Sequence, residues 1–276
     1  MRLAARTPPS ALLFGLVAAS AASTAPSVAA VDENPCLTPE ARELRCPDLR
    51  MKRPFDLAVD RRTKPGHALL RAGNSIDNVG RGPAELHGVR TRGPWMRGRQ
   101  RIYGREGGRL GLRTGAMLRY VSGHLGKRYW KFHDAAGFEL WRLDRRGRRK
   151  KLARRGAKVD YCLRDLRRTH PRLGRSPRRR VYPACNTSPV RRRVTLGTSV
   201  GWSDIYPPGY RRQYIDVTGL RGCFAYVEIA DPTNVLYESD EENNDAQAIV
   251  RLPYRPGPPR CPGHSTGEVM DEYGPY

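Results

Sequence analysis

The 276-residue sequence has few apolar runs, and this scarcity excludes a protein built on several membrane-spanning helices. One apolar stretch, over about residues 11–22, follows Arg2 and Arg6 and leads to small residues at 28–30. It is shorter than the roughly 18 apolar residues that a spanning helix requires. The pattern predicts a cleaved signal peptide over residues 1–30 and therefore a secreted protein, with an uncleaved anchor or lipoprotein as the alternative.

Several catalytic patterns are missing as well. There is no CxxC pair and no Cys/His spacing typical of a metal site. The six cysteines all follow the predicted signal, and cysteines of exported proteins usually form disulfides. Sequence order favours three pairs: Cys36 with Cys46, Cys162 with Cys185, and Cys223 with Cys261.

Acidic residues are few, with 27 Asp and Glu against 51 Lys and Arg, so the formal net charge is +24. The basic residues are concentrated between Arg142 and Arg180. Such an excess indicates attraction to polyanions, such as cell-wall polymers, acidic polysaccharide or anionic lipid head groups, and says little about the fold. A general preference of the genome for Arg explains the composition equally well. Nucleic acid is a weaker expectation, because no nucleic-acid-binding fold is recognisable.

Helical periodicity is scarce, whereas short alternating segments between Gly and Pro turns recur along the chain. This pattern is typical of an all-β sandwich, here with long irregular loops. Strands are expected at 138–143, 158–163, 213–217, 223–229 and 247–252. Helices are expected only at 38–44 and around 163–168, a long loop or irregular hairpin at 91–113, and a loop at 171–180. The simplest organisation is one domain over 31–258 and a Pro- and Gly-rich tail over 259–276.

The segment from His124 to Leu140 resembles, without a gap, the copper-binding segment of bacterial lysyl oxidases. That family reads approximately His-Pro-x-His-x-His-Trp-His-Phe-x-Asp, followed by Tyr-Glu-Leu. The leading His, the Trp, the Phe, the Asp and an aromatic-Glu-Leu sequence are present here. The three copper histidines of the family fall on Lys127, Tyr129 and Lys131.

Other blocks resemble the same family in the same order, so the likeness covers about residues 45–258. They are Cys46–Leu49, Leu69–Arg71, Asn78–Leu86, Lys158–Asp165, Gly201–Tyr206, Gln213–Val217 and Glu238–Asn244. The resemblance implies a sandwich core of the lysyl oxidase type.

Lysyl oxidases convert primary amines, including lysyl side chains, to aldehydes and release ammonia and hydrogen peroxide. They use copper and lysine tyrosylquinone, an organic cofactor made from one Lys and one Tyr, and the resemblance places these precursors at Lys158 and Tyr206. A lysine ammonium has no lone pair for a metal, so two lysines and a phenol make a poor copper site. His124 and His133 flank the segment at positions that the family does not use for copper.

We therefore expect a secreted lysyl oxidase-like domain that has lost copper-dependent amine oxidation, a pseudoenzyme that acts as a basic extracellular binding or structural module. The alternative is a copper and quinone amine oxidase that still acts on primary amines.

A calcium site is also expected, by resemblance to family members that hold calcium there. Its ligands would be Asp48, the Leu49 carbonyl, Glu238, Asp240, Asn243 and Asn244. Carboxylate, amide and backbone oxygens are the ligands that calcium takes in proteins. The alternative is a solvated acidic loop.

Overall fold

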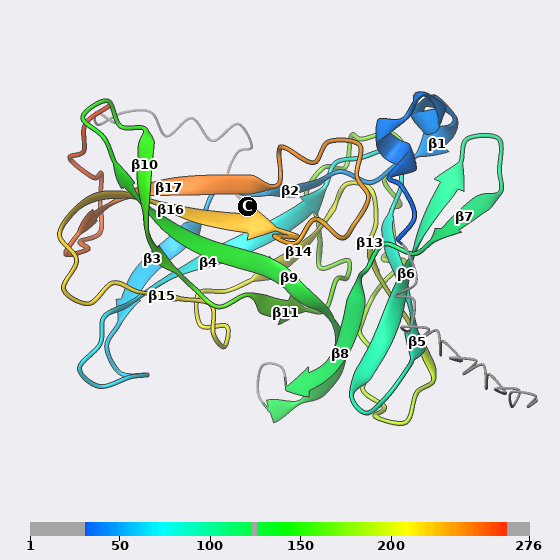
Figure 1. Cartoon of the computed structure of the whole chain (residues 1–276), viewed down its shortest axis with the longest axis horizontal. Coiled ribbons are helices and arrows are strands. Elements are labelled where there is room, and N and C mark those ends of the chain that lie inside the picture. Colours follow the sequence, from blue (N-terminus) through cyan, green and yellow to red (C-terminus); the bar gives the residue numbers. More distant parts are fainter. Residues whose placement is uncertain (1–30, 123–125, 264–276) are drawn as a thin grey trace, which may run out of the picture. The chain divides into compact units, whose positions relative to one another are not determined.

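In the computed structural model, residues 31–122 and 126–263 are described, and they form two antiparallel sheets without an α-helix (Figure 1). The all-β prediction is confirmed at this level. Two short 3-10 helices, η1 (Pro35–Leu37) and η2 (Pro39–Glu43), precede the first strand, and η2 occupies most of the segment expected to be helical at 38–44. No helix in the described part of the chain is long and apolar enough to cross a membrane.

The larger sheet has eleven strands, of which seven follow one another by hydrogen bonding. In that order they are β13 (Arg193–Thr198), β5 (Ala84–Arg90), β6 (Trp95–Gly104), β8 (Met117–Ser122), β9 (Arg128–Leu143), β16 (Gly222–Ala230) and β17 (Asp245–Leu252). The remaining four are β1 (Leu44–Arg45) and β7 (Arg109–Leu112) beside β6, and β10 (Arg149–Arg155) and β11 (Val159–Tyr161) beside β9.

The smaller sheet has six strands centred on β4. They are β12 (Arg167–Arg168), β14 (Trp202–Tyr206), β4 (Leu69–Asn78) and β15 (Ile215–Asp216), with β2 (Leu49–Met51) and β3 (Phe55–Asp60) also paired to β4.

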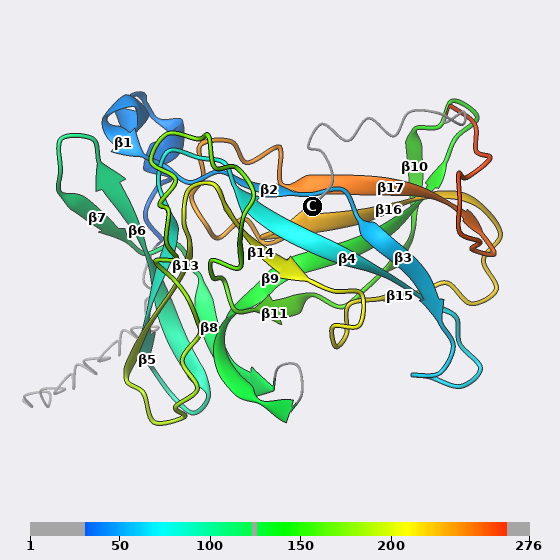
Figure 2. The same ribbon diagram turned by 180° about the vertical axis from the view of Figure 1, so that it is seen from behind.

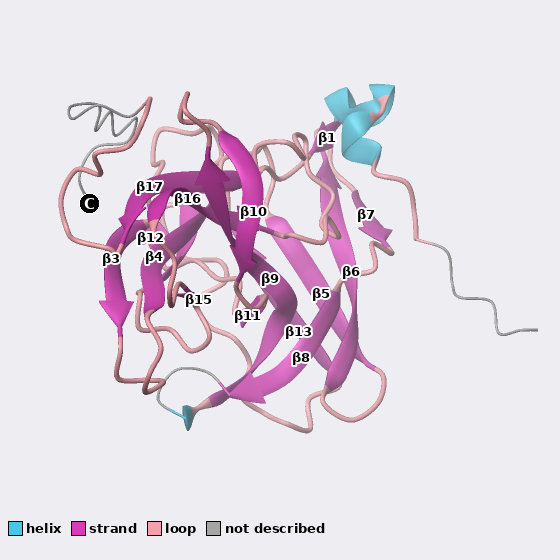
Figure 3. Cartoon of the chain, turned by 60° about the vertical axis from the view of Figure 1, so that its left-hand side comes forward, coloured by secondary structure: helices cyan, strands magenta, loops and turns pink. Residues whose placement is uncertain are grey.

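Strand β9 joins the two halves of the larger sheet and gives it its curl (Figure 3). Its first residues pair with β8, as in Tyr129 opposite Val121, and its last residues pair with β16, as in Leu140 opposite Tyr226. Between these two parts, Asp134 has a φ of 55° and the register against β11 shifts. Such a β-bulge bends a strand and increases its twist. The bend brings the start of β9 close to β11.

The hydrophobic core lies between the sheets. All ten residues of β4 are buried, and Figures 1 and 2 show β4 behind and then in front of β9 and β16. Leu70 and Ile76 of β4 belong to the same core cluster as Phe138 of β9 and Phe224 of β16. Burying each such side chain stabilises the fold by about 1.5–3 kcal/mol. This core holds both sheets in place around the candidate site.

Most of the expected strands are present, although their lengths differ. Residues 138–143, 223–229 and 247–252 lie within β9, β16 and β17, whereas 158–163 and 213–217 contain only the short β11 and β15. The segment 91–113 is a hairpin of β6 and β7, and 171–180 has no regular strand.

The expected helix around 163–168 is wrong, because this segment is extended and ends in β12. The reason lies in tertiary contacts. The fully buried carboxylate of Asp165 accepts hydrogen bonds from the backbone N–H groups of Val181, Tyr182 and Ser199. These bonds hold the segment against distant parts of the chain, and the local sequence pattern does not predict them.

The three disulfides are Cys36–Cys46, Cys162–Cys185 and Cys223–Cys261, so the predicted pairing is confirmed. They are consistent with an oxidising compartment. Each stabilises the fold by about 2–4 kcal/mol, mainly by restricting the unfolded chain. The predicted signal peptide and residues 264–276 of the predicted tail lie outside the described residues.

Candidate functional site

The three positions that match copper histidines lie at the start of β9. Lys127 is exposed just before the strand, Tyr129 is half-buried, and Lys131 is buried. Alternate residues of a strand point to the same side, so Tyr129 and Lys131 share a face of β9. His124 lies outside the described residues.

Of these three residues, Lys131 is the one whose side chain is buried and held by hydrogen bonds. Its Nζ donates one hydrogen bond to the Tyr210 hydroxyl at 2.6 Å and one to the Ser122 carbonyl at 3.2 Å. Burial lowers the pKa of Lys131 to about 8, and the negative charges of Asp160 and Asp204 oppose this shift. The side chain is therefore an amine that loses its proton more easily than an ordinary lysine.

Tyr210 belongs to a cluster of three tyrosines. The rings of Tyr161 and Tyr206 stack with their centroids 3.6 Å apart, and Tyr210 packs edge-on to both, at 5.4 and 4.7 Å. The Tyr206 hydroxyl accepts a hydrogen bond from the Cys162 N–H at 2.8 Å. Burial raises the pKa of Tyr206 well above its ordinary value. Tyr206, the predicted quinone precursor, is thus buried, and its hydroxyl is engaged in a hydrogen bond.

Asp204 lies two residues before Tyr206 on β14 and is fully buried. Neither of its carboxylate oxygens has a hydrogen-bond partner among the described residues. Burial raises the pKa of Asp204 well above its ordinary value, which favours its protonated form.

Lys158, the other predicted quinone precursor, is exposed at the start of β11. Its Nζ lies 3.8 Å from the Asp134 carboxylate. Asp134, His133 and Asp160 form the group within the described residues whose potential metal-binding atoms all lie within 4.8 Å of one another. In this group the His133 Nδ1 lies 2.8 Å from Asp160. Lys158 thus lies near Asp134, whereas the Tyr206 hydroxyl bonds to the Cys162 N–H. The two predicted quinone precursors have different polar partners.

Lys131 and Lys158 do meet at one place, a depression of about 370 Å³ between β8, β9, β11 and the turn before β15. Tyr210 also lines it, whereas Tyr206 packs against the Tyr210 ring and is not part of the lining. Six basic side chains lie along its wall against the single carboxylate of Asp160. The six are Arg119, Arg128, Lys131, Lys158, Arg211 and Arg212. We call this feature the cationic depression.

The sequence pointed to a different basic region. Of the run from Arg142 to Arg180, Lys158 is the member that lines the cationic depression, and Arg119, Arg128, Arg211 and Arg212 were not predicted. The available signal was weak. Arg211 and Arg212 directly follow Tyr210, just before a block that matches lysyl oxidases, but nothing in the sequence places β8 opposite that turn.

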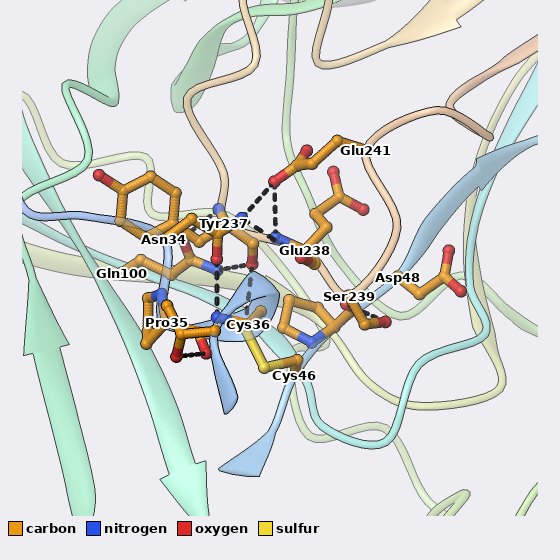
Figure 4. Close-up of a disulfide and its surroundings, with 12 residues drawn as sticks. Asn34, Pro35, Cys36, Cys46, Asp48, Gln100, Tyr237, Glu238, Ser239 and Glu241 are labelled. Carbon is orange, nitrogen blue, oxygen red and sulfur yellow. Dashed lines mark hydrogen bonds between the residues drawn. A yellow bond between two sulfur atoms is a disulfide. The ribbon is translucent and has the colours of Figure 1, made fainter. Parts of the chain in front are cut away.

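The predicted calcium ligands gather around the turn Glu238–Asn244, which we call the acidic turn. Asp48 and Glu238 lie beside the Cys36–Cys46 disulfide (Figure 4). The side-chain amide of Asn243 donates to Asp48 and that of Asn244 donates to Glu238, both at 3.0 Å. The backbone N–H of Leu49 also donates to Glu238. Asp240 accepts a bond from the Glu242 N–H within the turn.

The acidic turn contains buried oxygens that lack partners in the described part of the chain. They are the amide oxygens of Asn243 and Asn244 and one carboxylate oxygen of Glu241. Burial raises the pKa of Asp48, that of Glu238 and that of Glu241, the last to about 7. Oxygens of this kind fit a hard cation such as calcium. Glu241 was not predicted, although it lies inside the matched block.

No protein-family model matches the sequence, and no curated protein matches it, so the likeness to lysyl oxidases rests on the motifs alone and stays a prediction.

Proposed function

We propose that the protein is an extracellular domain of the lysyl oxidase type that binds anionic polymers at the cationic depression and has lost amine oxidation. The observation that carries this proposal is the set of six basic side chains around one hollow of about 370 Å³. Four of the six are arginines, whose planar guanidinium groups bind carboxylates and phosphates in pairs of hydrogen bonds. Uronic-acid and teichoic-type polymers carry such groups at regular intervals.

The charge of the whole chain supports the same function. A net charge of +24 attracts polyanions over distance, and a hollow lined by one sign of charge focuses that attraction. Arg211 and Arg212 are exposed at the depression, so a polymer can reach them without a rearrangement of the fold.

Copper does not fit the residues at the matched positions. Lys131 uses two N–H groups as donors to Tyr210 and Ser122, and Lys127 is exposed. None of the three matched positions offers an imidazole, the ligand that suits copper. We therefore assign no step to copper or to lysine tyrosylquinone.

Calcium does fit the acidic turn. Asp48, Glu238, Asn243 and Asn244 would hold it, and the cation would neutralise buried carboxylates and satisfy the unpaired amide oxygens. Its role would be to tie the acidic turn to β2.

The test is binding of the full chain to polygalacturonate and to a teichoic-type polymer over a salt series. Binding should weaken steeply from about 0.05 M to about 0.5 M salt, because the screening length shortens over this range. The variant R211E/R212E should bind at least about tenfold more weakly. The matched control R145E/R146E makes the same change in charge at the exposed β9–β10 turn and should lose less than about threefold.

Equal losses in the two variants would show that net charge alone attracts the polymer and would refute a site in the depression. A quinone chromophore and peroxide release from a primary amine, measured on copper-loaded protein, would refute the loss of amine oxidation.

A further inference from the structure

Lys131 combines three properties that seldom occur together. It is 3% exposed, it lines a depression large enough for a small molecule, and its amine is held by a tyrosine hydroxyl at 2.6 Å. An ammonium group has three N–H donors, and two of them are used by Tyr210 and Ser122. No third hydrogen-bond partner of Nζ is found among the described residues, so the remaining position on the nitrogen can take a ligand in the depression.

We propose that Lys131 is a nucleophile that condenses with small anionic aldehydes or 2-oxo acids to form an imine. The neutral amine adds to the carbonyl carbon and a C–N bond forms. The nitrogen gives up its two protons, the oxygen takes up two, and the C–O bond breaks, so that water leaves and a C=N bond remains. The reaction needs no oxidant or reductant. This activity goes beyond polymer binding and does not depend on it.

The acid–base state of Lys131 favours this chemistry. With a pKa of about 8, about a tenth of the amine is neutral at pH 7, against roughly 0.03% of an ordinary lysine. Lysines desolvated in this manner are typical nucleophiles toward carbonyl groups. Tyr210 is the positioning residue, because its hydroxyl accepts a hydrogen bond from Nζ and fixes the direction of the amine.

The surroundings of Lys131 select the charge of the ligand. Arg128, Lys158 and Arg211 line the same hollow and would bind a carboxylate or phosphate next to the reacting carbonyl. The opposing charge in the lining is that of Asp160, which already contacts His133, because the buried Asp204 favours its protonated form. An anionic carbonyl compound should therefore react faster than a neutral one of equal size.

The test uses glyoxylate and cyanoborohydride, which reduces an imine to a stable secondary amine, followed by peptide mapping. The exposed residues Lys127 and Lys158 are internal controls in the same chain. At neutral pH, modification of Lys131 should be at least about tenfold faster than that of either control, because far more of its amine is neutral. The rate at Lys131 should level off above pH 8, whereas the rates at the controls should continue to rise. Even labelling of all lysines, or none at Lys131, would overturn the proposal.

Three variants distinguish a nucleophilic role of Lys131 from a purely structural one. K131R should abolish trapping at this position, since an arginine does not form the imine, whereas K150R, at an exposed lysine outside the depression, should leave it within about twofold. Y210F should slow trapping at Lys131 and shift its pH profile, which a merely structural tyrosine would not do. If K131R does not fold, the comparison within the unmodified chain still decides the matter. Loss of polymer binding with intact trapping would refute only the proposed function.

Discussion

The cationic depression and the acidic turn hold buried charge in opposite ways. In the depression, the Lys131 amine lies where the resemblance expects a metal, and it donates to Tyr210 and Ser122. In the acidic turn, Arg50 approaches Asp48 at 3.8 Å, but Glu238 and Glu241 have no ion pair among the described residues. One site thus carries its own cation, whereas the other has buried carboxylates without one among the described residues, which is why we propose a calcium ion there.

The largest expected effect comes from reversing the charge at Lys131. In K131E, a carboxylate would lie near Asp160 and Asp204 without a partner, so we expect a loss of about 3–5 kcal/mol in the free energy of unfolding. Denaturant unfolding followed by circular dichroism measures it. The control K131M removes the charge but keeps about the same side-chain length. It should lower the free energy of unfolding much less, because an unpaired buried charge is the main penalty. Equal free energies of unfolding for K131E and the parent protein would contradict the view that the depression depends on the buried cation of Lys131.

Calcium should have the next largest effect. At a concentration one hundred times its dissociation constant, it would raise the free energy of unfolding by about 2.7 kcal/mol. Thermal unfolding with calcium, and again after chelation, measures the shift. In N243A/N244A the shift should vanish, because these residues supply the unpaired oxygens. Magnesium is the control cation. A calcium shift of the same size in the variant would place the ion elsewhere.

A smaller effect is the pH dependence of the calcium-free protein. Burial and the nearby acids Asp231, Asp240 and Asp48 raise the pKa of Glu241 to about 7, above its ordinary value of 4.5. A carboxyl with a raised folded-state pKa contributes stability below pH 4.5 and loses it as the pH rises through about 7.

The stability of the chelated protein should therefore fall between about pH 4.5 and pH 7, and E241Q should reduce this slope. Urea unfolding at a series of pH values provides the measurement. Calcium should remove most of the loss, since it binds the ionised form. A slope that is unchanged in E241Q would assign the pH dependence to other groups.

The smallest expected effect is at Lys158. Its Nζ lies 3.8 Å from Asp134, and 44% of its side chain is exposed. Exposed ion pairs of this kind contribute between about 0 and 1 kcal/mol, so K158A should unfold almost as the parent does. A loss comparable to that of K131E would show that Lys158 has a buried partner and would narrow the contrast between the two lysines.

Local pattern was sufficient for much of the fold. The strands around Phe138, Phe224 and Val250 alternate or carry β-branched and aromatic residues, and each lies in a long ladder. The disulfide pairs follow sequence order because each closes a short or moderate loop. The helix prediction for 163–168 failed because the conformation of this segment depends on Asp165, whose hydrogen-bond partners lie far along the chain.

The sites were less accessible to sequence reasoning. Motif matching selected Lys131 and Glu238, but it did not show that Lys131 donates to Tyr210 or that Glu241 has a buried unpaired oxygen. It also placed the basic region at 142–180, whereas the cationic depression draws on Arg119 and Arg211 from elsewhere. These features depend on which strands face each other.

The sequence by itself determined the all-β class and favoured the cysteine pairing that the structure shows, because these follow from local alternation and sequence order. Only the tertiary structure decided which charges are buried and which meet. The bend of β9 at Asp134 brings its first residues toward β11 and the turn at Tyr210, and burial there changes an ordinary lysine into a less basic amine. Desolvation depends on every neighbour in space, so no short segment of sequence contains it.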